Sequence, residues 1–201
     1  MYFRLFYERT RNLIVDPVHE WEKIKLENAR SEFISFYLAF PIFIAITFSY
    51  LIGKLWPSER NYFNQYDTIF IITDLLLQFA IPLLVLYTLY SVVKYINQGF
   101  QISTTDRNRD FRYLFYSLIP VYLYFIFSGL IPRFENIFIL IGIFSIYLLY
   151  TGAKIMMEIS IEKVIPYIVS LIIVYMLIYK IISEICRNLL HFIGNQISPL
   201  T

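Results

Sequence analysis

Cysteine and charged residues are scarce in this 201-residue sequence, which limits the chemistry it can perform. Cys186 is the single cysteine, and this excludes an intramolecular disulfide and a metal site built from cysteines. No glycine-rich phosphate-binding loop occurs. Charged residues make up 16% of the chain and the net charge is +2, so nucleic acid is not an expected partner. We therefore expect no catalytic residues, no metal site, no cofactor and no enzymatic activity.

Apolar and aromatic residues are abundant. The chain is 58% hydrophobic and 19% aromatic, with 18 tyrosines and 19 phenylalanines. Its mean hydropathy is +0.60. Soluble domains contain about 45–50% apolar residues, and tyrosine is typical of membrane interfaces. This composition indicates an integral membrane protein.

Five segments are long and apolar enough to cross a bilayer, which requires about 20 residues each. These segments are 33–55, 69–93, 113–131, 137–153 and 164–182. We therefore predict an all-α, polytopic membrane protein. Residues 1–32 form short interfacial helices, residues 33–186 form a five-helix transmembrane bundle, and residues 187–201 form a short C-terminal tail.

The distribution of Lys and Arg predicts the orientation in the membrane. The N-terminal segment and the second and fourth links carry six, four and two of these residues, which gives twelve on one side. The first and third links and the C-terminal side carry two, one and two, which gives five. We expect a cytoplasmic N-terminus, an outside C-terminus and a bacterial inner membrane. This topology separates His19 from His191, so the two cannot share a metal.

The stretch IVDPVHEWEKIKLENARSEF, just before the first span, predicts a short helix. Asp16 can cap its start, and Pro17 suits the first turn. Val18, Trp21 and Ile24 repeat at a spacing of three and share one face. Asp16, Pro17, Trp21 and Ile24 form a candidate platform that binds lipid headgroups or docks a partner. The alternative is an anchor that covers the cytoplasmic ends of the spans, which is common in membrane proteins.

Asp74 is the most informative single residue, because it lies inside the second span, where a charge is costly. Gln78 follows one turn deeper. Lys180 and Glu184 lie near the outer end of the fifth span, in the same leaflet. We predict that Asp74 faces the bundle interior and pairs with Lys180. The group either holds two helices together or belongs to a proton or ion path, and the first alternative is favoured because no deeper acid or histidine occurs.

The second link contains Arg107, Arg109 and Arg112, which are candidates for contact with anionic lipid headgroups. Asp106 and Asp110 offset much of their charge. We interpret the cluster first as an orientation signal and second as a lipid or partner contact.

Three stretches carry a resemblance to a known family. They are DPVHEWEKIKLEN before the first span, GFQISTTDRNRDFRYLFYSLIP into the third span, and IYLLYTGAKIMMEISIEKVIPYIV from the fourth span to the fifth. Their order resembles the Yip-domain family of Ypt/Rab-interacting membrane proteins, from Leu13 to about Ile182. The resemblance implies a helical membrane bundle without catalytic chemistry and, in eukaryotic members, a role in vesicle trafficking beside Rab-type GTPases.

The sequence departs from the eukaryotic members at its N-terminus. Those members carry a long cytosolic region with a Tyr-Gly-Pro-type motif, whereas about thirty residues precede the first span here. This favours a prokaryotic-type member and speaks against a GTPase partner. The expected function is that of an adaptor, assembly factor or trafficking-type scaffold that binds lipid and a membrane protein or a second copy. The alternative is a small transporter, channel or lipid-moving protein that uses Asp74, Gln78 and Lys180.

Overall fold

The fold is all-helical in a computed structural model that describes residues 2–26, 31–55, 68–102 and 106–197. Five helices are long and apolar enough to cross a membrane, which confirms the predicted all-α polytopic fold. The elements, in chain order, are α1 (Tyr2–Val15), α2 (Pro17–Leu26), α3 (Ser31–Ile34), the π-helix η1 (Ser35–Ala39), α4 (Phe40–Lys54), α6 (Thr68–Gly99), α7 (Arg107–Ser117), α8 (Ile119–Leu130), the 3₁₀ turn η3 (Pro132–Phe134), α9 (Glu135–Ile155) and α10 (Ile161–Ile197).

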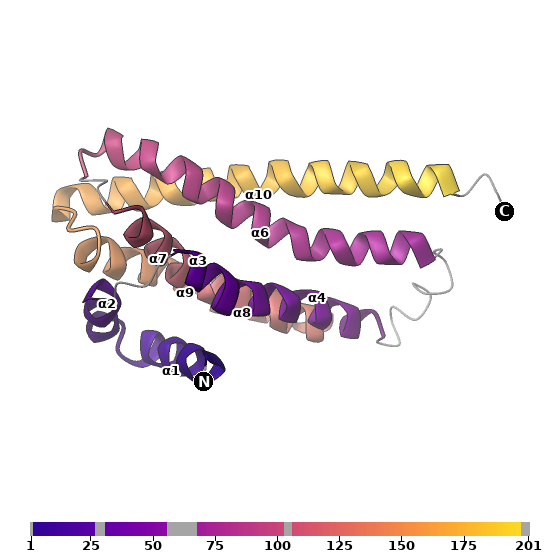
Figure 1. Cartoon of the computed structure of the whole chain (residues 1–201), viewed down its shortest axis with the longest axis horizontal. Helices are drawn as coiled ribbons and strands as arrows, with labels where there is room; N and C mark the ends of the chain where they lie inside the picture. The colour runs from indigo at the N-terminus through magenta and orange to yellow at the C-terminus, as the bar shows by residue number, and fades with distance from the viewer. Residues whose placement is uncertain (1, 27–30, 56–67, 103–105, 198–201) are drawn as a thin grey trace.

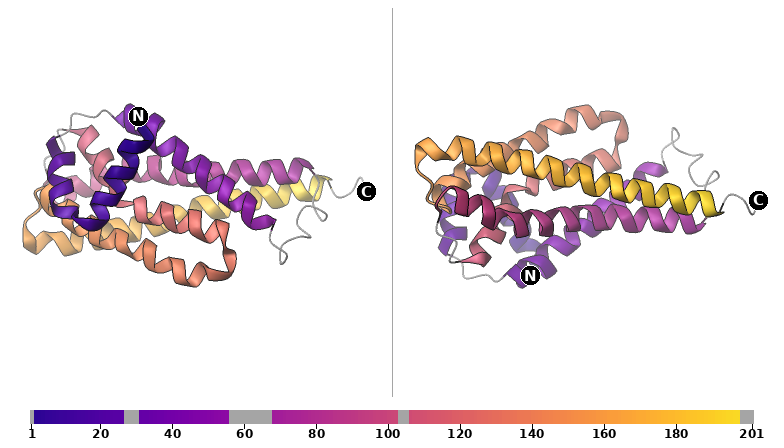
Figure 2. Two further views of the ribbon diagram at one scale, coloured as in Figure 1. Left: turned by 90° about the horizontal axis from the view of Figure 1, so that it is seen from below. Right: turned by 90° about the horizontal axis from the view of Figure 1, so that it is seen from above.

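The long helices form two groups (Figure 1). Helices α6 and α10 lie side by side, and α8 packs against both α4 and α9. Helices α1 and α2 lie together at one end of the bundle, which we call the α2 end. The C-terminus lies at the other end, which we call the opposite end. There α6 and α10 extend past the α8–α9 hairpin (Figure 2).

Prolines interrupt two of the spans. The first span has a π-helical turn, η1, immediately before Pro41 at the start of α4. The third span is divided at Leu118, between α7 and α8, with Pro120 in the first turn of α8. Because proline has no N–H to donate, a helix most easily accommodates it at a first turn or beside a local irregularity. The bends shape the helices that surround the core.

Two helices extend beyond the predicted span boundaries. The helix of the third span begins at Arg107, where the Asp106 carboxylate caps it by accepting a 2.9 Å hydrogen bond from the Asn108 N–H. Helix α10 runs from Ile161 to Ile197, so much of the predicted tail is helical. Apolar runs mark where lipid is contacted, whereas caps and backbone hydrogen bonds determine where a helix ends.

Small residues allow α4 and α8 to cross closely. A Cβ atom on Gly129 would lie 2.6 Å from the Ser49 hydroxyl oxygen, which is too close for a real contact. A Cβ atom on Gly53 would overlap the carbonyl oxygen of Gly129. Close backbone approach through small residues is the usual means of packing helices in a bilayer. Gly53 and Gly129 therefore fix the position of α8 against α4.

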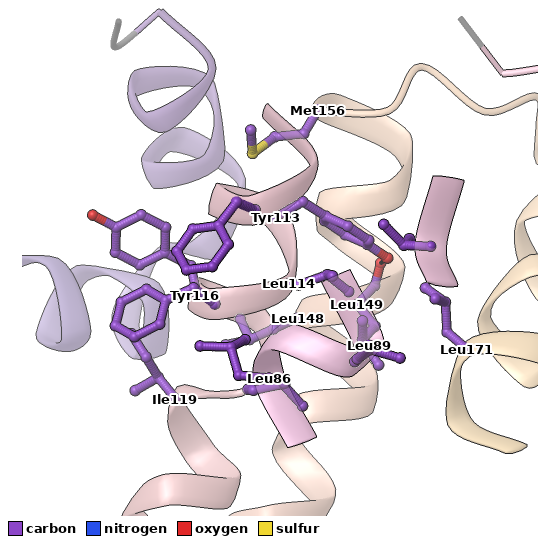
Figure 3. Close-up of a cluster of buried hydrophobic side chains, with 14 of the residues drawn as sticks. Leu86, Leu89, Tyr113, Leu114, Tyr116, Ile119, Leu148, Leu149, Met156 and Leu171 are labelled. Carbon is purple, nitrogen blue, oxygen red and sulfur yellow. Dashed lines mark hydrogen bonds between the residues drawn. The ribbon is translucent and has the colours of Figure 1, made fainter. Parts of the chain in front are cut away.

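The core is concentrated near the α2 end, around α7. Every residue from Asp110 to Pro120 is buried. Figure 3 shows Tyr113, Leu114 and Tyr116 of this helix beside Leu148 and Leu149 of α9. Aromatic rings provide large apolar surfaces in this region, since Phe111 and Phe115 are both fully buried. Helix α7 is thus the central element of the bundle.

Candidate functional site

Trp21 joins α2 to the membrane helices. Its side chain has no exposed surface, and its Nε1–H donates a 3.1 Å hydrogen bond to the Thr151 hydroxyl. Its ring centroid lies 6.0 Å from that of Tyr113. A Cβ atom on Gly152 would lie 2.8 Å from Trp21 Cζ2 and 2.9 Å from Tyr113 Cε2. Gly152 therefore provides the space into which the indole fits.

Burial decides between the two interpretations of this helix. Pro17, Trp21 and Ile24 are all buried, so their side chains are not available to lipid headgroups or to a partner. Asp16 is exposed and caps α2, because its Oδ1 accepts a 3.3 Å hydrogen bond from the His19 N–H. The structure thus favours the anchor over the docking platform.

Ion pairs reinforce the attachment of α1 and α2. Arg9 of α1 forms an ion pair with the buried carboxylate of Glu20, which also accepts a 3.1 Å hydrogen bond from Asn12. Lys25 of α2 forms an ion pair with Glu158, which follows α9. The hydrogen bond and positive charge of Lys25 lower the pKa of Glu158 below its ordinary value. Helices α1 and α2 are therefore linked to each other and to the end of α9.

A buried chain of hydrogen bonds joins three helices at the α2 end. The Tyr167 hydroxyl of α10 donates to Asn97 Oδ1 of α6 over 2.9 Å. The Asn97 amide donates to the Asp110 carboxylate of α7 over 3.2 Å. All three side chains are buried. Sequence reasoning missed this chain because Asn97 and Asp110 fell in a predicted link, and nothing in the sequence pairs them with Tyr167.

The arginine cluster is divided between surface and interior. Arg107 is exposed and Arg109 is half-buried. Arg112 is only 3% exposed, and its guanidinium lies 3.5 Å from the Asp106 carboxylate. Arg112 is therefore buried within the bundle, whereas contact of Arg107 and Arg109 with lipid headgroups stays a prediction.

Asp74 belongs to a polar cluster between α4 and α6. It is 5% exposed, and its carboxylate accepts a 2.8 Å hydrogen bond from the Tyr50 hydroxyl. A longer contact of 3.5 Å joins it to the Gln78 amide. The position agrees with the expected inward orientation of Asp74. The main partner is Tyr50, which lies on the first span.

The structure does not show the predicted pairing of Asp74 with Lys180. Lys180 is exposed on α10 and forms no ion pair with any residue that the structure describes. Helices α6 and α10 pack with Asn97 opposite Tyr167 and with Phe70 beside Gly194. Asp74 therefore lies level with residue 190 of α10, about 15 Å along the helix axis from Lys180 at 1.5 Å per residue. Glu184 is also exposed and lies 3.4 Å from Arg187, one turn further along α10.

Two cavities adjoin the Asp74 cluster. One of about 250 Å³ is lined in part by Tyr50, Lys54, Gln78 and Glu135. A smaller one of about 40 Å³ lies between Gln78, Tyr122 and two tyrosines of α10, Tyr175 and Tyr179. The smaller cavity has room for a water molecule. The Tyr122 hydroxyl is buried and has no hydrogen-bond partner among the described residues, so a water molecule there would satisfy it.

The fold and these sites define an integral membrane protein made of a helical bundle, with a polar cluster around Asp74 and N-terminal helices packed against the bundle. A family model, the Yip1 domain, matches residues 11–182, and the chain belongs to this family. No curated protein and no solved structure matches the chain significantly.

The three stretches that carry the resemblance meet in space. Trp21 of the first stretch packs on Tyr113 of the second and on Gly152 of the third. These residues are far apart in the sequence and form one buried contact at the α2 end. Within this chain, the resemblance therefore coincides with the packing of the anchor.

Proposed function

We propose that this chain is a non-enzymatic membrane adaptor, oriented with the α2 end in the cytoplasm, that binds a membrane-protein partner through α6 and α10. The binding surface is the α6–α10 arm, which we define as residues 68–76 of α6 and 181–194 of α10. The two helices stay together along the arm, since a Cβ atom on Gly194 would lie 3.3 Å from the Phe70 ring. The exposed apolar side chains of the arm are Ile69, Ile72, Leu76, Ile181, Ile185, Leu189 and Phe192.

The length of α10 is the observation that supports the proposal. Its apolar segment, Ile161–Gly194, has 34 residues, or about 51 Å at 1.5 Å per residue. A bilayer with its headgroups measures about 40–45 Å. Lys180, Glu184 and Arg187 mark the start of the interface, because charges are costly in the hydrocarbon core. The exposed apolar residues that follow Lys180 therefore lie in the headgroup layer or beyond it.

Exposed apolar surface outside the hydrocarbon core favours a protein partner. Leu189 is 47% exposed and Phe192 is 63% exposed, at a level where lipid tails do not cover them. The exposed apolar side chains of the arm form an uncharged surface that lies close to the membrane. A membrane protein that presents an apolar helix near the interface has the matching chemistry.

The experiment is to purify the chain from its native membrane in mild detergent and to compare it with two variants that each add one charge to the arm. Leu189→Lys places the charge among the exposed apolar side chains, and Asn188→Lys places the same charge at an exposed polar position beside them. We expect a stoichiometric membrane-protein partner whose recovery falls at least tenfold with Leu189→Lys and is unchanged with Asn188→Lys. Recovery of the chain alone, or as a homo-oligomer, would contradict the proposal.

A second function, transport, is favoured by the polar cluster and its cavities. Asp74 is a buried acid bonded to two residues, Tyr50 and Gln78, that also line the larger cavity. On this alternative, proton flux in liposomes falls at least tenfold with Asp74→Asn and is unchanged with Glu184→Gln, the same substitution at an exposed acid. If Asp74→Asn changes only thermal stability, the cluster is structural and this alternative is wrong.

A further inference from the structure

A groove of about 730 Å³ runs between the α8–α9 hairpin and α10. Figure 2 shows the hairpin diverging from α10 towards the opposite end. The floor is apolar and buried, with Leu114 of α7, Leu149 of α9 and Leu171 of α10. Along the rim, Ile143 and Leu177 are more than half exposed. The groove is thus accessible from the side of the bundle that faces lipid.

Polar atoms gather at one end of this groove. Tyr124, Tyr179 and Lys180 line it, and Lys180 is the one cation among its lining residues. The Lys180 ammonium forms no ion pair with a residue in the described part of the chain. Lys180 lies near the middle of α10, and its flexible stem allows the ammonium to extend along apolar surface towards the headgroups. The groove therefore combines an apolar interior with one cation.

We propose that this groove binds an anionic phospholipid, with one acyl chain along the apolar floor and the phosphate bound by Lys180. The Tyr179 hydroxyl beside Lys180 provides a further hydrogen-bond donor for a phosphate oxygen, whereas the Tyr124 hydroxyl donates to the Glu135 carboxylate over 3.0 Å. The Ser145 hydroxyl is buried in the groove wall and has no hydrogen-bond partner among the described residues.

The size of the groove suits a small-molecule ligand. Between Leu171 and Lys180 it follows α10 for about 14 Å, at 1.5 Å per residue. Its volume of about 730 Å³ is within the range of roughly 300–1,000 Å³ that small-molecule ligand sites occupy.

The test uses the purified chain in phosphatidylcholine vesicles, without any partner protein. Phosphatidylglycerol and phosphatidylcholine probes carry the same spin label at the same acyl-chain carbon. The fraction of each probe that the protein immobilises measures how strongly that lipid associates with the protein. We expect phosphatidylglycerol to associate about fivefold more strongly, the effect of one cation near an anionic group. Lys180→Gln removes this preference, whereas Arg187→Gln, a matched change on the same helix outside the groove, retains it.

A second pair of variants tests the groove itself. Ile143→Trp fills the groove and reduces the immobilised fraction of both probes at least threefold. Ile137→Trp adds the same ring at an exposed position of α9 that does not line the groove, and leaves both fractions unchanged. Equal association of the two probes, or no effect of Ile143→Trp, would overturn the proposal. Loss of a co-purified partner with Ile143→Trp, but no loss of bound lipid, would assign the groove to a protein helix.

Discussion

Gly152 determines how closely α2 approaches the membrane helices, because two aromatic rings occupy the space where a side chain would begin. Trp21 and Tyr113 each lie within 3 Å of the position of its missing Cβ atom. Neither ring can move easily, since both are fully buried. A methyl group at this position therefore strains a close-packed contact rather than filling a gap.

We predict that Gly152→Ala destabilises the protein. Overpacking of a buried site costs about 1–3 kcal/mol, and each kcal/mol lowers the melting temperature by about 2–4 °C in a chain of this size. The measurement is thermal unfolding in detergent.

Gly142→Ala is the matched control on the same helix. A Cβ atom on Gly142 would lie 3.6 Å from Tyr124 Cβ, an ordinary contact distance, so the variant should melt at the wild-type temperature or above. Equal destabilisation by the two substitutions would show that the Trp21 contact does not limit the site.

At the scale of single helices, hydropathy located all five spans but not their ends. The charged turns at Arg107 and beyond Lys180 continue as helix in the structure. Hydropathy reports which residues can face lipid, and a helix continues into water wherever its backbone hydrogen bonds and caps allow. The projecting part of α10 could not be predicted for this reason.

The environment of Asp74 shows a different limit. The predicted fifth span ended at residue 182, which placed Lys180 at the depth of Asp74, but α10 continues to Ile197 and Lys180 lies deeper than Asp74. Hydropathy and spacing also say nothing about which helices are neighbours. The choice of Tyr50 follows from the packing of α4 against α6, which only the structure provides.

Buried contacts between distant segments were the least predictable part of the site. The spacing of Val18, Trp21 and Ile24 predicted one face of α2, and Trp21 and Ile24 are buried whereas Val18 is 49% exposed. The spacing did not tell whether that face meets protein or the membrane surface. The hydrogen bond from Trp21 to Thr151 joins residues 130 positions apart. No local pattern in a single sequence encodes such a contact.

For the molecule as a whole, the excess of Lys and Arg predicts that the α2 end lies in the cytoplasm. The test uses a Cys186→Ser background, with single cysteines at two exposed positions, Glu22→Cys on α2 and Asn188→Cys on α10. In intact cells, a membrane-impermeant maleimide should label Asn188→Cys, and should label Glu22→Cys only after permeabilisation. The reverse pattern would contradict the proposed orientation.

The attachment of α2 through Trp21 also has a consequence for the order of assembly. Ribosomes make the N-terminal helices first, yet the surface that receives Trp21 is completed by Thr151 and Gly152 of the fourth span. During synthesis the indole therefore has no binding site until four spans are in the bilayer. Docking of α2 therefore follows the insertion of the fourth span.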